Sequence, residues 1–406
     1  MILNSRLKII LLALALAIGT ILIGWLLYAL LLKPAPPAVE VQTEQTTDSQ
    51  TGGGTLTLSE EAGERAGTEE PTGTGTLPSA VASGGATFTQ RLTSTGIDAP
   101  TLLDGNAIAY YNPIDGRFYM IDDSGNIKVL SNAQFPGAAS VVFADSAEIV
   151  ALEFPDGSNI LYNLEQEKQI TLPSHWEEFE FSGDGSQVIN KVITASGSNN
   201  ALTISQSDGS KTTAIADLGG NADKVTVNWS PNNQVVGFSQ TGSTQSGFGR
   251  SQIYLIGVDG QEAGAIIVEG ANFSGIWSPS GNTILYSVAL ASNDDRPSLW
   301  LTNATGEVGH DRTRLEVETW VEKCTFTGEE SIICAAPKEV TAGSGIDDRL
   351  ITSSDNIYEI NLISGRAKLL ATPVLDLKLF NLKVSDDGTL LYFTDQYERL
   401  NYMKLK

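Results

Sequence analysis

The stretch WSPSGNTILYS, from Trp277 to Ser287, decides the fold of this chain. An aromatic residue is followed by a Ser-Pro-Ser-Gly turn, and then by a run of large apolar and β-branched residues. Proline presets one turn dihedral and glycine accepts a positive φ, so the stretch predicts a tight turn that leads into a β-strand. If the stretch is repeated along the chain, the repeat defines the architecture.

Similar turns recur at intervals of 38 to 58 residues, each with an apolar residue before the turn and an apolar strand after it. The residues that lead into these turns are Phe143, Phe181, Trp229, Trp277, Phe326 and Val384. A third strand, a polar turn and a fourth strand usually follow, as in Ile253–Ile256, Asp259-Gly260 and Ala265–Val268. Four strands in about 40 to 50 residues are typical of one blade of a β-propeller.

The two ends of the repeat region indicate how many blades there are. Residues 101–130 contain three strand-like runs (AIAYYN, GRFYMID and NIKVL) and form a further, degenerate unit. The last unit has only three strands, whereas Ala86–Leu92 is a strand without a partner. An open ring would leave two exposed sheet edges, so we expect this N-terminal strand to complete the last blade. The sequence therefore predicts an all-β, seven-bladed β-propeller of four-stranded antiparallel blades over residues 86–406. Six blades is the alternative, if the first unit is an irregular lead-in.

The repeat resembles that of the TolB-like, WD-repeat-related β-propellers of bacterial envelope proteins. The resemblance is carried by the turn Trp277–Gly281, by the Ile-Leu-Tyr that follows it, and by the strands Leu299–Leu301 and Ile253–Leu255. Similar blades form the non-catalytic propeller of prolyl oligopeptidase-type enzymes. The resemblance covers residues 86–406 and implies a platform for protein interactions, but it carries over no individual binding residue.

The N-terminal 85 residues have a different composition. Ile9–Leu32 is an apolar run of about 24 residues, which is enough to cross about 30 Å of hydrocarbon as a helix. Arg6 and Lys8 precede it, so the positive-inside rule predicts a cytoplasmic N-terminus (residues 1–8) and an extracytoplasmic C-terminal part. Residues 33–85 are rich in Pro, Gly, Thr, Ser and Glu, and we expect a disordered linker there. The apolar run Ile9–Leu32 is not amphipathic, which argues against a buried core helix.

Charge and residue inventory exclude several functions. The net charge of −23 opposes binding to nucleic acid or to anionic lipid. The chain has two histidines, His175 and His310, and no G-x-S-x-G motif, so we expect no catalytic triad and no His- or Cys-based zinc site. Asp122–Asn126 lacks the distal glutamate of an EF-hand and is predicted to be a turn. No catalytic residue, cofactor or metal ligand is therefore assigned.

The two cysteines, Cys324 and Cys334, lie in one predicted hairpin. If its turn is centred on Glu329, they occupy opposed positions on paired strands, where Cβ atoms lie about 4.5–5.5 Å apart. This is close to the distance that a disulfide requires, and an extracytoplasmic location would permit oxidation. Two buried, reduced thiols are the alternative.

Long loops between the second and third strands of three neighbouring blades are the candidate binding region. Binding residues concentrate in loops that a rigid scaffold positions, so we expect a polar patch for a partner there. Local Asp–Arg pairing in solvated loops is the alternative. The candidate residues are Phe248, Arg250, Asp294, Asp295, Arg296, Asp347, Asp348 and Arg349.

The sequence thus favours a single-pass protein of the cell membrane. Its propeller is expected to act as a non-enzymatic protein–protein interaction scaffold in the cell envelope, with other envelope proteins as partners. A ligand- or glycan-binding sensor and a propeller enzyme are the alternatives. A scaffold should show an uninterrupted surface patch, a glycan binder an exposed Trp at the mouth of the central channel, and an enzyme a cluster of carboxylates or histidines there.

Overall fold

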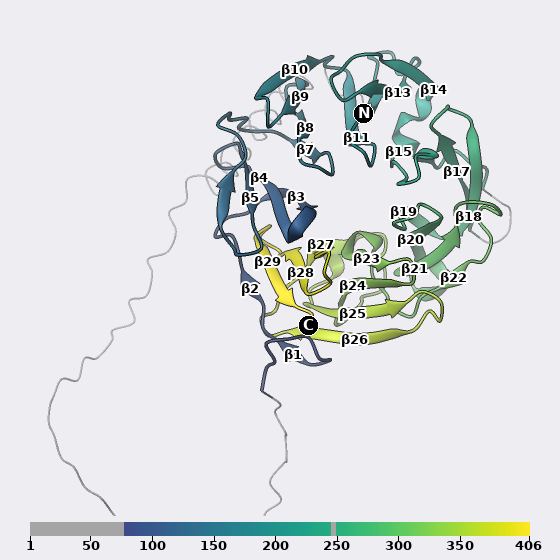
Figure 1. The fold of residues 1–406 in the computed structure, drawn as a ribbon. Helices are drawn as coiled ribbons and strands as arrows, with labels where there is room; N and C mark the ends of the chain where they lie inside the picture. Colours follow the sequence, from purple (N-terminus) through teal and green to yellow (C-terminus); the bar gives the residue numbers. More distant parts are fainter. Residues whose placement is uncertain (1–76, 245–248) are drawn as a thin grey trace, which may run out of the picture. The chain divides into compact units, whose positions relative to one another are not determined.

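The computed structural model describes residues 77–244 and 249–406, which form seven sheets arranged around a ring (Figure 1). Six sheets have four strands, and the sixth blade has a fifth strand at its outer edge. Apart from that added strand, neighbouring strands within a blade are antiparallel. The seven-bladed propeller is confirmed, and the six-bladed alternative is excluded because residues 98–129 form a complete blade.

The strands are numbered in chain order from the N-terminus. Blade 1 contains β3 (Asp98–Leu103), β4 (Ala107–Asn112), β5 (Arg117–Ile121) and β6 (Ile127–Val129). Blade 2 contains β7 (Ser140–Phe143), β8 (Ile149–Glu153), β9 (Asn159–Asn163) and β10 (Lys168–Leu172). Blade 3 contains β11 (Trp176–Phe181), β12 (Gln187–Val192), β13 (Ala201–Gln206) and β14 (Thr213–Asp217). Blade 4 contains β15 (Val225–Val227), β16 (Val235–Ser239), β17 (Arg250–Gly257) and β18 (Glu262–Glu269).

The remaining blades follow the same order. Blade 5 contains β19 (Ala271–Trp277), β20 (Thr283–Leu290), β21 (Arg296–Asn303) and β22 (Thr313–Arg314). Blade 6 contains β23 (Cys324–Gly328), β24 (Ser331–Pro337), β25 (Asp355–Asn361) and β26 (Ala367–Pro373) with β1 (Ala86–Thr87). Blade 7 contains β27 (Phe380–Val384), β28 (Leu390–Thr394), β29 (Leu400–Lys404) and β2 (Gln90–Arg91). Short 3-10 helices, η2 (Asp104–Asn106), η3 (Gly219–Lys224), η4 (Ala291–Asn293), η5 (Val321–Lys323) and η6 (Asp348–Leu350), connect some of them.

The second strand of each blade is apolar because neighbouring blades cover both faces of the sheet. In β20, for example, all six residues from Ile284 to Ala289 are buried. The aromatic residue of the opening stretch packs between two blades: the ring centroid of Trp277 lies 5.3 Å from that of Phe238 in blade 4. Phe238 also contacts Phe273 at 5.5 Å. The aromatic residue before the blade 5 turn therefore joins blades 4 and 5.

In blades 3, 4, 5 and 7 the turn after the innermost strand is held by the serine that the repeat contains. In blade 4, Oγ of Ser230 accepts hydrogen bonds from the backbone N–H groups of Gln234 and Val235, at 3.1 and 2.9 Å. Gly281 of the blade 5 turn has a φ of +70°, and a Cβ there would lie 2.7 Å from the side chain of Asn232. That side chain donates to the Gly281 carbonyl at 2.9 Å, so successive turns are also linked to one another.

The ring is closed by the N-terminal segment, which forms two strands where the sequence predicts one. β2 pairs antiparallel with β29, as expected for the fourth strand of blade 7. β1 instead pairs parallel with β26 of blade 6, because the edge of that strand offers unpaired backbone groups. The contacts begin before the expected boundary at residue 86: Ala82 donates to the Lys404 carbonyl at 2.9 Å and Gly84 to the Leu370 carbonyl at 2.8 Å.

Within residues 77–244 and 249–406, no helix is both long and apolar enough to cross a membrane. The predicted span Ile9–Leu32 lies outside the described residues, as do residues 1–8 and the predicted linker as far as residue 76.

Candidate interaction surface on blades 5 to 7

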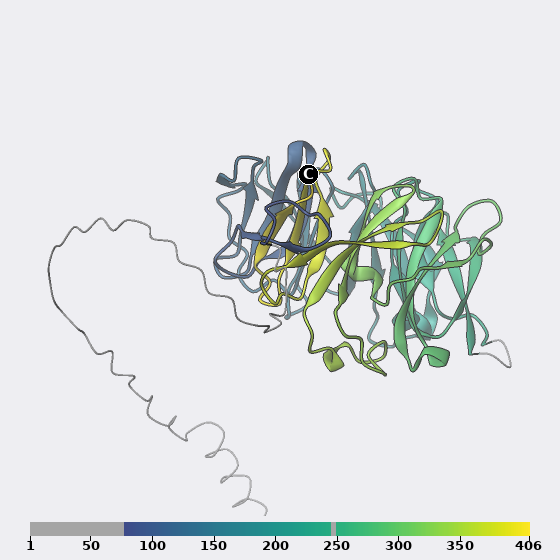
Figure 2. The same ribbon diagram turned by 90° about the horizontal axis from the view of Figure 1, so that it is seen from below.

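Loops of blades 5, 6 and 7 meet on one face of the ring. These are the loops between the second and third strands of each blade, together with the connections that lead into blades 6 and 7. Because the strands are antiparallel, all of these segments end on the same face, here called the loop face. Figure 2 shows the short helical turns of the long blade 5 and blade 6 loops projecting from the ring in one direction.

The long loops of blades 5 and 6 contact each other through their backbones. Gly343 donates to the Asp294 carbonyl at 2.7 Å and Gly345 to the Asp295 carbonyl at 2.8 Å. A Cβ on Gly345 would lie 2.7 Å from that carbonyl, so this approach requires glycine. Asn272 of β19 adds a side-chain hydrogen bond to the Gly345 carbonyl at 3.1 Å. The blade 6 loop is thereby held over the inner end of blade 5.

The candidate residues in these two loops mostly make local contacts. Asp347 forms two hydrogen bonds with the guanidinium of Arg349, at 2.7 and 2.9 Å, which lower the pKa of the Asp347 carboxyl. Asp294 and Asp295 adopt left-handed turn conformations with φ near +53° and +52°. Arg296 lies 3.9 Å from Glu318. The contact between Asp347 and Arg349 is an example of the local Asp–Arg pairing that the sequence analysis gave as the alternative.

The blade 4 candidates do not join this group. Arg250 lies at the start of β17 and its guanidinium is 2.6 Å from Glu269 on the neighbouring strand β18. Phe248 lies outside the described residues. Of the seven candidate residues that the structure describes, Asp348 and Arg349 line the cavity described next and the other five do not.

A cavity of about 630 Å³ opens on the loop face where blades 5, 6 and 7 meet. Its apolar lining comes from Phe273 on β19, from Trp320 just before η5, from Ile346 and Ile351 in the blade 6 loop, and from Phe380 at the start of β27. The volume falls in the range of about 300–1,000 Å³ that is typical of small-molecule sites. Sequence reasoning missed this site because its residues come from separate blades and share no motif.

Exposed apolar side chains are common on the face on which this cavity opens, and two of them, Ile346 and Phe380, line it. Six of the twelve large apolar side chains that are exposed in the described residues lie on the loop face of blades 6 and 7, so this region is enriched in them. We call these six residues the apolar rim: Ile346, Leu350, Val374, Leu375, Phe380 and Tyr397. Their loops are joined by hydrogen bonds from Lys378, whose Nζ donates to the Ile351 carbonyl at 2.7 Å and whose backbone N–H donates to Gln396 at 3.1 Å.

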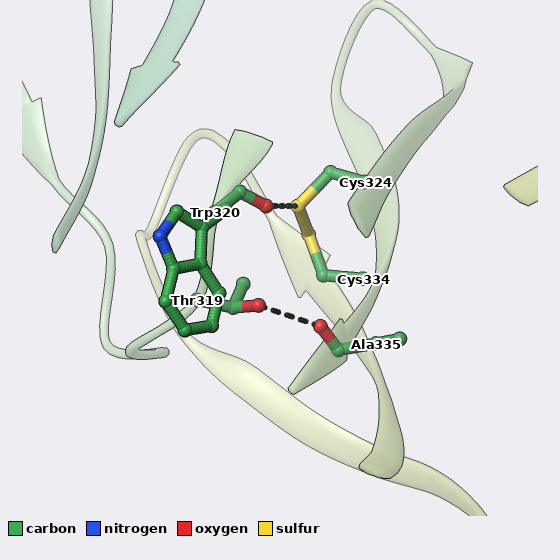
Figure 3. The surroundings of a disulfide bond; sticks show 5 residues. All are labelled: Thr319, Trp320, Cys324, Cys334 and Ala335. Atoms are coloured by element: carbon green, nitrogen blue, oxygen red, sulfur yellow. Dashed lines mark hydrogen bonds between the residues drawn. A yellow bond between two sulfur atoms is a disulfide. The ribbon is translucent and has the colours of Figure 1, made fainter. Parts of the chain in front are cut away.

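A disulfide fixes the wall of the cavity that carries Trp320 (Figure 3). Cys324 and Cys334 lie directly opposite each other on β23 and β24, with a Cα–Cα distance of 4.1 Å, and their sulfur atoms are bonded. Sγ of Cys324 is 3.7 Å from the Trp320 carbonyl oxygen. The hydroxyl of Thr319 donates to the Ala335 carbonyl at 2.7 Å. The hydrogen bond of Thr319 therefore attaches the segment before η5 to β24 of blade 6.

We expect the double variant Cys324→Ala, Cys334→Ala to lower the free energy of unfolding by about 2–3 kcal/mol. The reason is that the bond closes a loop across a sequence separation of 10, which restricts the unfolded chain. Urea denaturation measures the change. Dithiothreitol should destabilise the unaltered protein and leave the variant unaffected. Equal stability of the two proteins under oxidising conditions would show that the thiols are reduced.

A buried ion pair contributes Lys323 to the wall of the cavity. Nζ of Lys323 is 2.6 Å from Oδ2 of Asp355, and their side chains are 7% and 0% exposed. The same carboxylate oxygen accepts a hydrogen bond from the backbone N–H of Leu379 at 2.7 Å. Burial lowers the pKa of Lys323 and raises the pKa of Asp355, although each charge favours the ionised form of the other. The pair joins the connection into blade 6 to the connection into blade 7.

The centre of the ring holds a second group of charges, on the innermost strands of blades 2, 3 and 7. Glu180 of β11 accepts a hydrogen bond from the Trp229 backbone at 3.0 Å, and burial, helped by the charge of Asp145, raises its pKa to about 7. Burial raises the pKa of Asp145, and the charge of Lys383, on β27 of blade 7, lowers it in part. In the described residues no group of three or more His, Cys, Asp or Glu side chains could hold a metal ion.

Comparisons with known proteins support the architecture. No protein-family model matches the chain, and no curated protein matches it. Among solved structures, an oligogalacturonate lyase in complex with manganese is 11% identical with a TM-score of 0.51, covering 78% of this chain and 92% of that one. An oligogalacturonate lyase from Vibrio parahaemolyticus is 10% identical with a TM-score of 0.51, covering 78% and 93%. A chain of the mitotic checkpoint complex is 14% identical with a TM-score of 0.53, covering 86% and 98%. At these identities the similarity shows the fold alone.

Proposed function

We propose that this propeller is a non-enzymatic interaction scaffold that binds a partner protein on the loop face of blades 5 to 7. The observation that carries the proposal is the apolar rim on the face on which the cavity opens. Exposed apolar patches on soluble domains mark interaction sites, and half of the exposed large apolar side chains in the described part of the chain gather here. The rim lies on loops that hydrogen bonds hold together, so the surface is largely preformed.

The N-terminal sequence adds a location to this proposal. Ile9–Leu32 would anchor the protein in the cell membrane with its N-terminus in the cytoplasm, and the propeller would meet its partner outside the cytoplasm, in the cell envelope. An extracytoplasmic location is also compatible with the bond between Cys324 and Cys334.

A second candidate is a sensor that binds a small ligand or a glycan. It is supported by Trp320 and Phe380, which line a cavity large enough for such a ligand. Exposed aliphatic side chains outside the cavity lining, such as Leu350 and Leu375, add apolar surface on the same face. A hydroxylated sugar gains little from contact with these aliphatic side chains, whereas a protein partner can bury them. We therefore place the interaction scaffold first.

The test is site-specific photocrosslinking in the cells that produce this protein. A photoreactive phenylalanine analogue at Ile346 or Leu375 should crosslink the same discrete partner. The matched control position is Ile363, which is 72% exposed but lies in a blade 6 turn on the opposite face. Changing Ile346, Leu350 and Leu375 together to serine should abolish capture of that partner, and Ile363→Ser should not. Equal crosslinking from both faces, or capture that survives the triple change, contradicts the proposal.

A further inference from the structure

One lysine–carboxylate pair differs from the others in its burial. Nζ of Lys323 is 2.6 Å from Oδ2 of Asp355, and the two side chains are only 7% and 0% exposed. In the other two lysine–carboxylate pairs of the described part of the chain, at least half of the carboxylate side chain is exposed. Water stabilises the charges of those two pairs, whereas the charges of Lys323 and Asp355 depend on each other.

Burial disfavours the charged form of both groups in this pair. It lowers the pKa of the Lys323 amine and raises the pKa of the Asp355 carboxyl. Transfer of one proton along the 2.6 Å hydrogen bond from Nζ to Oδ2 converts the ion pair into a neutral amine and a carboxylic acid. No proton has to be exchanged with solvent in this conversion. A neutral lysine amine is a nucleophile, and the carbon atom nearest to it in the pair is that of the carboxyl group.

The two oxygens of the Asp355 carboxylate have different environments. Oδ2 accepts hydrogen bonds from Nζ of Lys323 and, at 2.7 Å, from the backbone N–H of Leu379. Oδ1 is buried and has no hydrogen-bond partner among the described residues. The N–H donor stabilises the negative charge that Oδ2 acquires when a nucleophile attacks Cγ, as the donors of an oxyanion hole do. Loss of Oδ1 removes a buried polar atom that lacks a hydrogen bond.

We propose that Lys323 and Asp355 condense to form an amide (isopeptide) bond in the folded protein. Nζ gives one proton to the carboxyl group, and its lone pair then attacks Cγ. The Nζ–Cγ bond forms and the Cγ–Oδ1 bond breaks. Of the three protons of the ammonium group, two leave with Oδ1 as water and one stays on the amide nitrogen. Oδ2 becomes the amide oxygen and keeps the hydrogen bond from Leu379. The step needs no oxidant, reductant or further reactant.

Two physical effects favour this condensation inside the protein. In water both reactants are stabilised as ions, and this stabilisation is lost on burial. The two groups are also already in contact, and groups held in reacting positions behave as if their concentration were as high as about 10⁵–10⁸ M. The product is neutral, so two buried charges disappear. Lys323 lines the cavity, which gives the released water a route to solvent.

The amide bond gives blade 6 a second covalent cross-link. Lys323 directly precedes Cys324, whose disulfide joins β23 to β24. Asp355 is the first residue of β25, so the amide joins the start of the blade to its third strand. Blade 6 is also the blade to which β1 adds. The two cross-links together hold three strands of this blade against unfolding. The freshly folded protein holds the ion pair, and the amide forms from it.

Mass spectrometry of the full-length protein tests the proposal. The folded protein is incubated for several days, reduced, alkylated and digested with trypsin. The amide blocks cleavage after Lys323, so we expect residues 315–338 to be joined to residues 350–366, with a mass one water molecule below the sum of the two peptides. The joined peptide should increase with time until it accounts for most of the protein. If residues 315–323 and 350–366 are still recovered as separate peptides from most of the protein, the proposal is wrong.

Three controls show whether the bond depends on burial, on the amine and on the fold. Lys338 and Asp376 form an exposed pair at 3.5 Å in the same chain, and their peptides should stay separate. The variant Lys323→Arg keeps a cation opposite Asp355 but lacks the reactive amine, and it should yield no joined peptide. Protein kept in urea during the incubation should also yield none, because the two residues no longer meet. A joined product in these controls, in the proportion found for the folded protein, would identify an unspecific condensation and overturn the proposal.

Discussion

A chain that ends at Glu398 is expected to lose cooperative unfolding altogether. The truncation removes β29, which supplies two fully buried side chains, Leu400 and Met403, and which is the only partner of β2 among the described strands. Burial of each such side chain is worth about 1.5–3 kcal/mol, and the ladder hydrogen bonds on both edges of β29 are lost as well. Together these losses are comparable with the whole stability of a domain, about 5–15 kcal/mol. Differential scanning calorimetry would show no single sharp transition.

The control for this truncation is a chain that ends at Leu405. It retains the backbone hydrogen bond from Leu405 to the Thr389 carbonyl at 2.7 Å, and should keep its unfolding temperature within a few degrees. A cooperative transition in the Glu398 chain at the temperature of the longer chain would mean that the ring does not depend on the β2–β29 pairing.

The substitution Lys323→Met is expected to lower the free energy of unfolding by about 3–5 kcal/mol. Removing one partner of a buried ion pair leaves an uncompensated charge, here on Asp355, whose side chain is 0% exposed. The double variant Lys323→Met, Asp355→Asn should recover part of the loss, because asparagine removes the charge and keeps an oxygen for the backbone N–H of Leu379. Urea denaturation at constant pH compares the three proteins.

The destabilisation by Lys323→Met should grow with pH. Burial already raises the pKa of Asp355, and removing the lysine removes the main influence that lowers it. A carboxyl whose folded pKa is raised binds its proton more tightly in the folded state, so stability is retained at low pH and lost as the pH rises through the folded pKa. The deficit at pH 8 should therefore exceed that at pH 5. A deficit that is the same at both values contradicts the assignment of the charge to Asp355.

A surface pair provides the matched control for this substitution. Lys338 lies 3.5 Å from Asp376, which is 90% exposed. Lys338→Met should cost less than about 1 kcal/mol, because exposed ion pairs contribute little. A loss as large as that of Lys323→Met would show that removal of a lysine, rather than its burial, causes the effect.

The propeller could be predicted from sequence because each blade is specified by local chemistry. The turn after Trp277 uses serine, proline and glycine, and its serine recurs in the turns after Phe181, Trp229 and Val384, with glycine or asparagine near the end of each turn. The closure of the ring could also be predicted, because the N-terminal end of the repeat region has a strand without a partner and the C-terminal blade lacks one strand. The pairing of β1 with β26 could not, since two residues in an extended conformation carry no signal of which edge they join.

The cavity could not be predicted for a different reason. Phe273, Trp320 and Phe380 are separated by more than 40 residues each and meet only because the ring places blades 5, 6 and 7 side by side. The loop sequences made Asp347 and Arg349 candidates for binding a partner. These two residues are only two positions apart, and their side chains form an ion pair with each other instead.

The way in which the N-terminal segment enters the propeller has a mechanical consequence. Ala82 is bonded to blade 7, Gly84 and β1 to blade 6, and β2 again to blade 7. A pull on the chain ahead of Leu77 is therefore shared between two blades before it reaches β2. We expect the hydrogen bonds of Ala82, Gly84 and β1 to break first under such a force. The β2–β29 pairing that closes the ring breaks only after them.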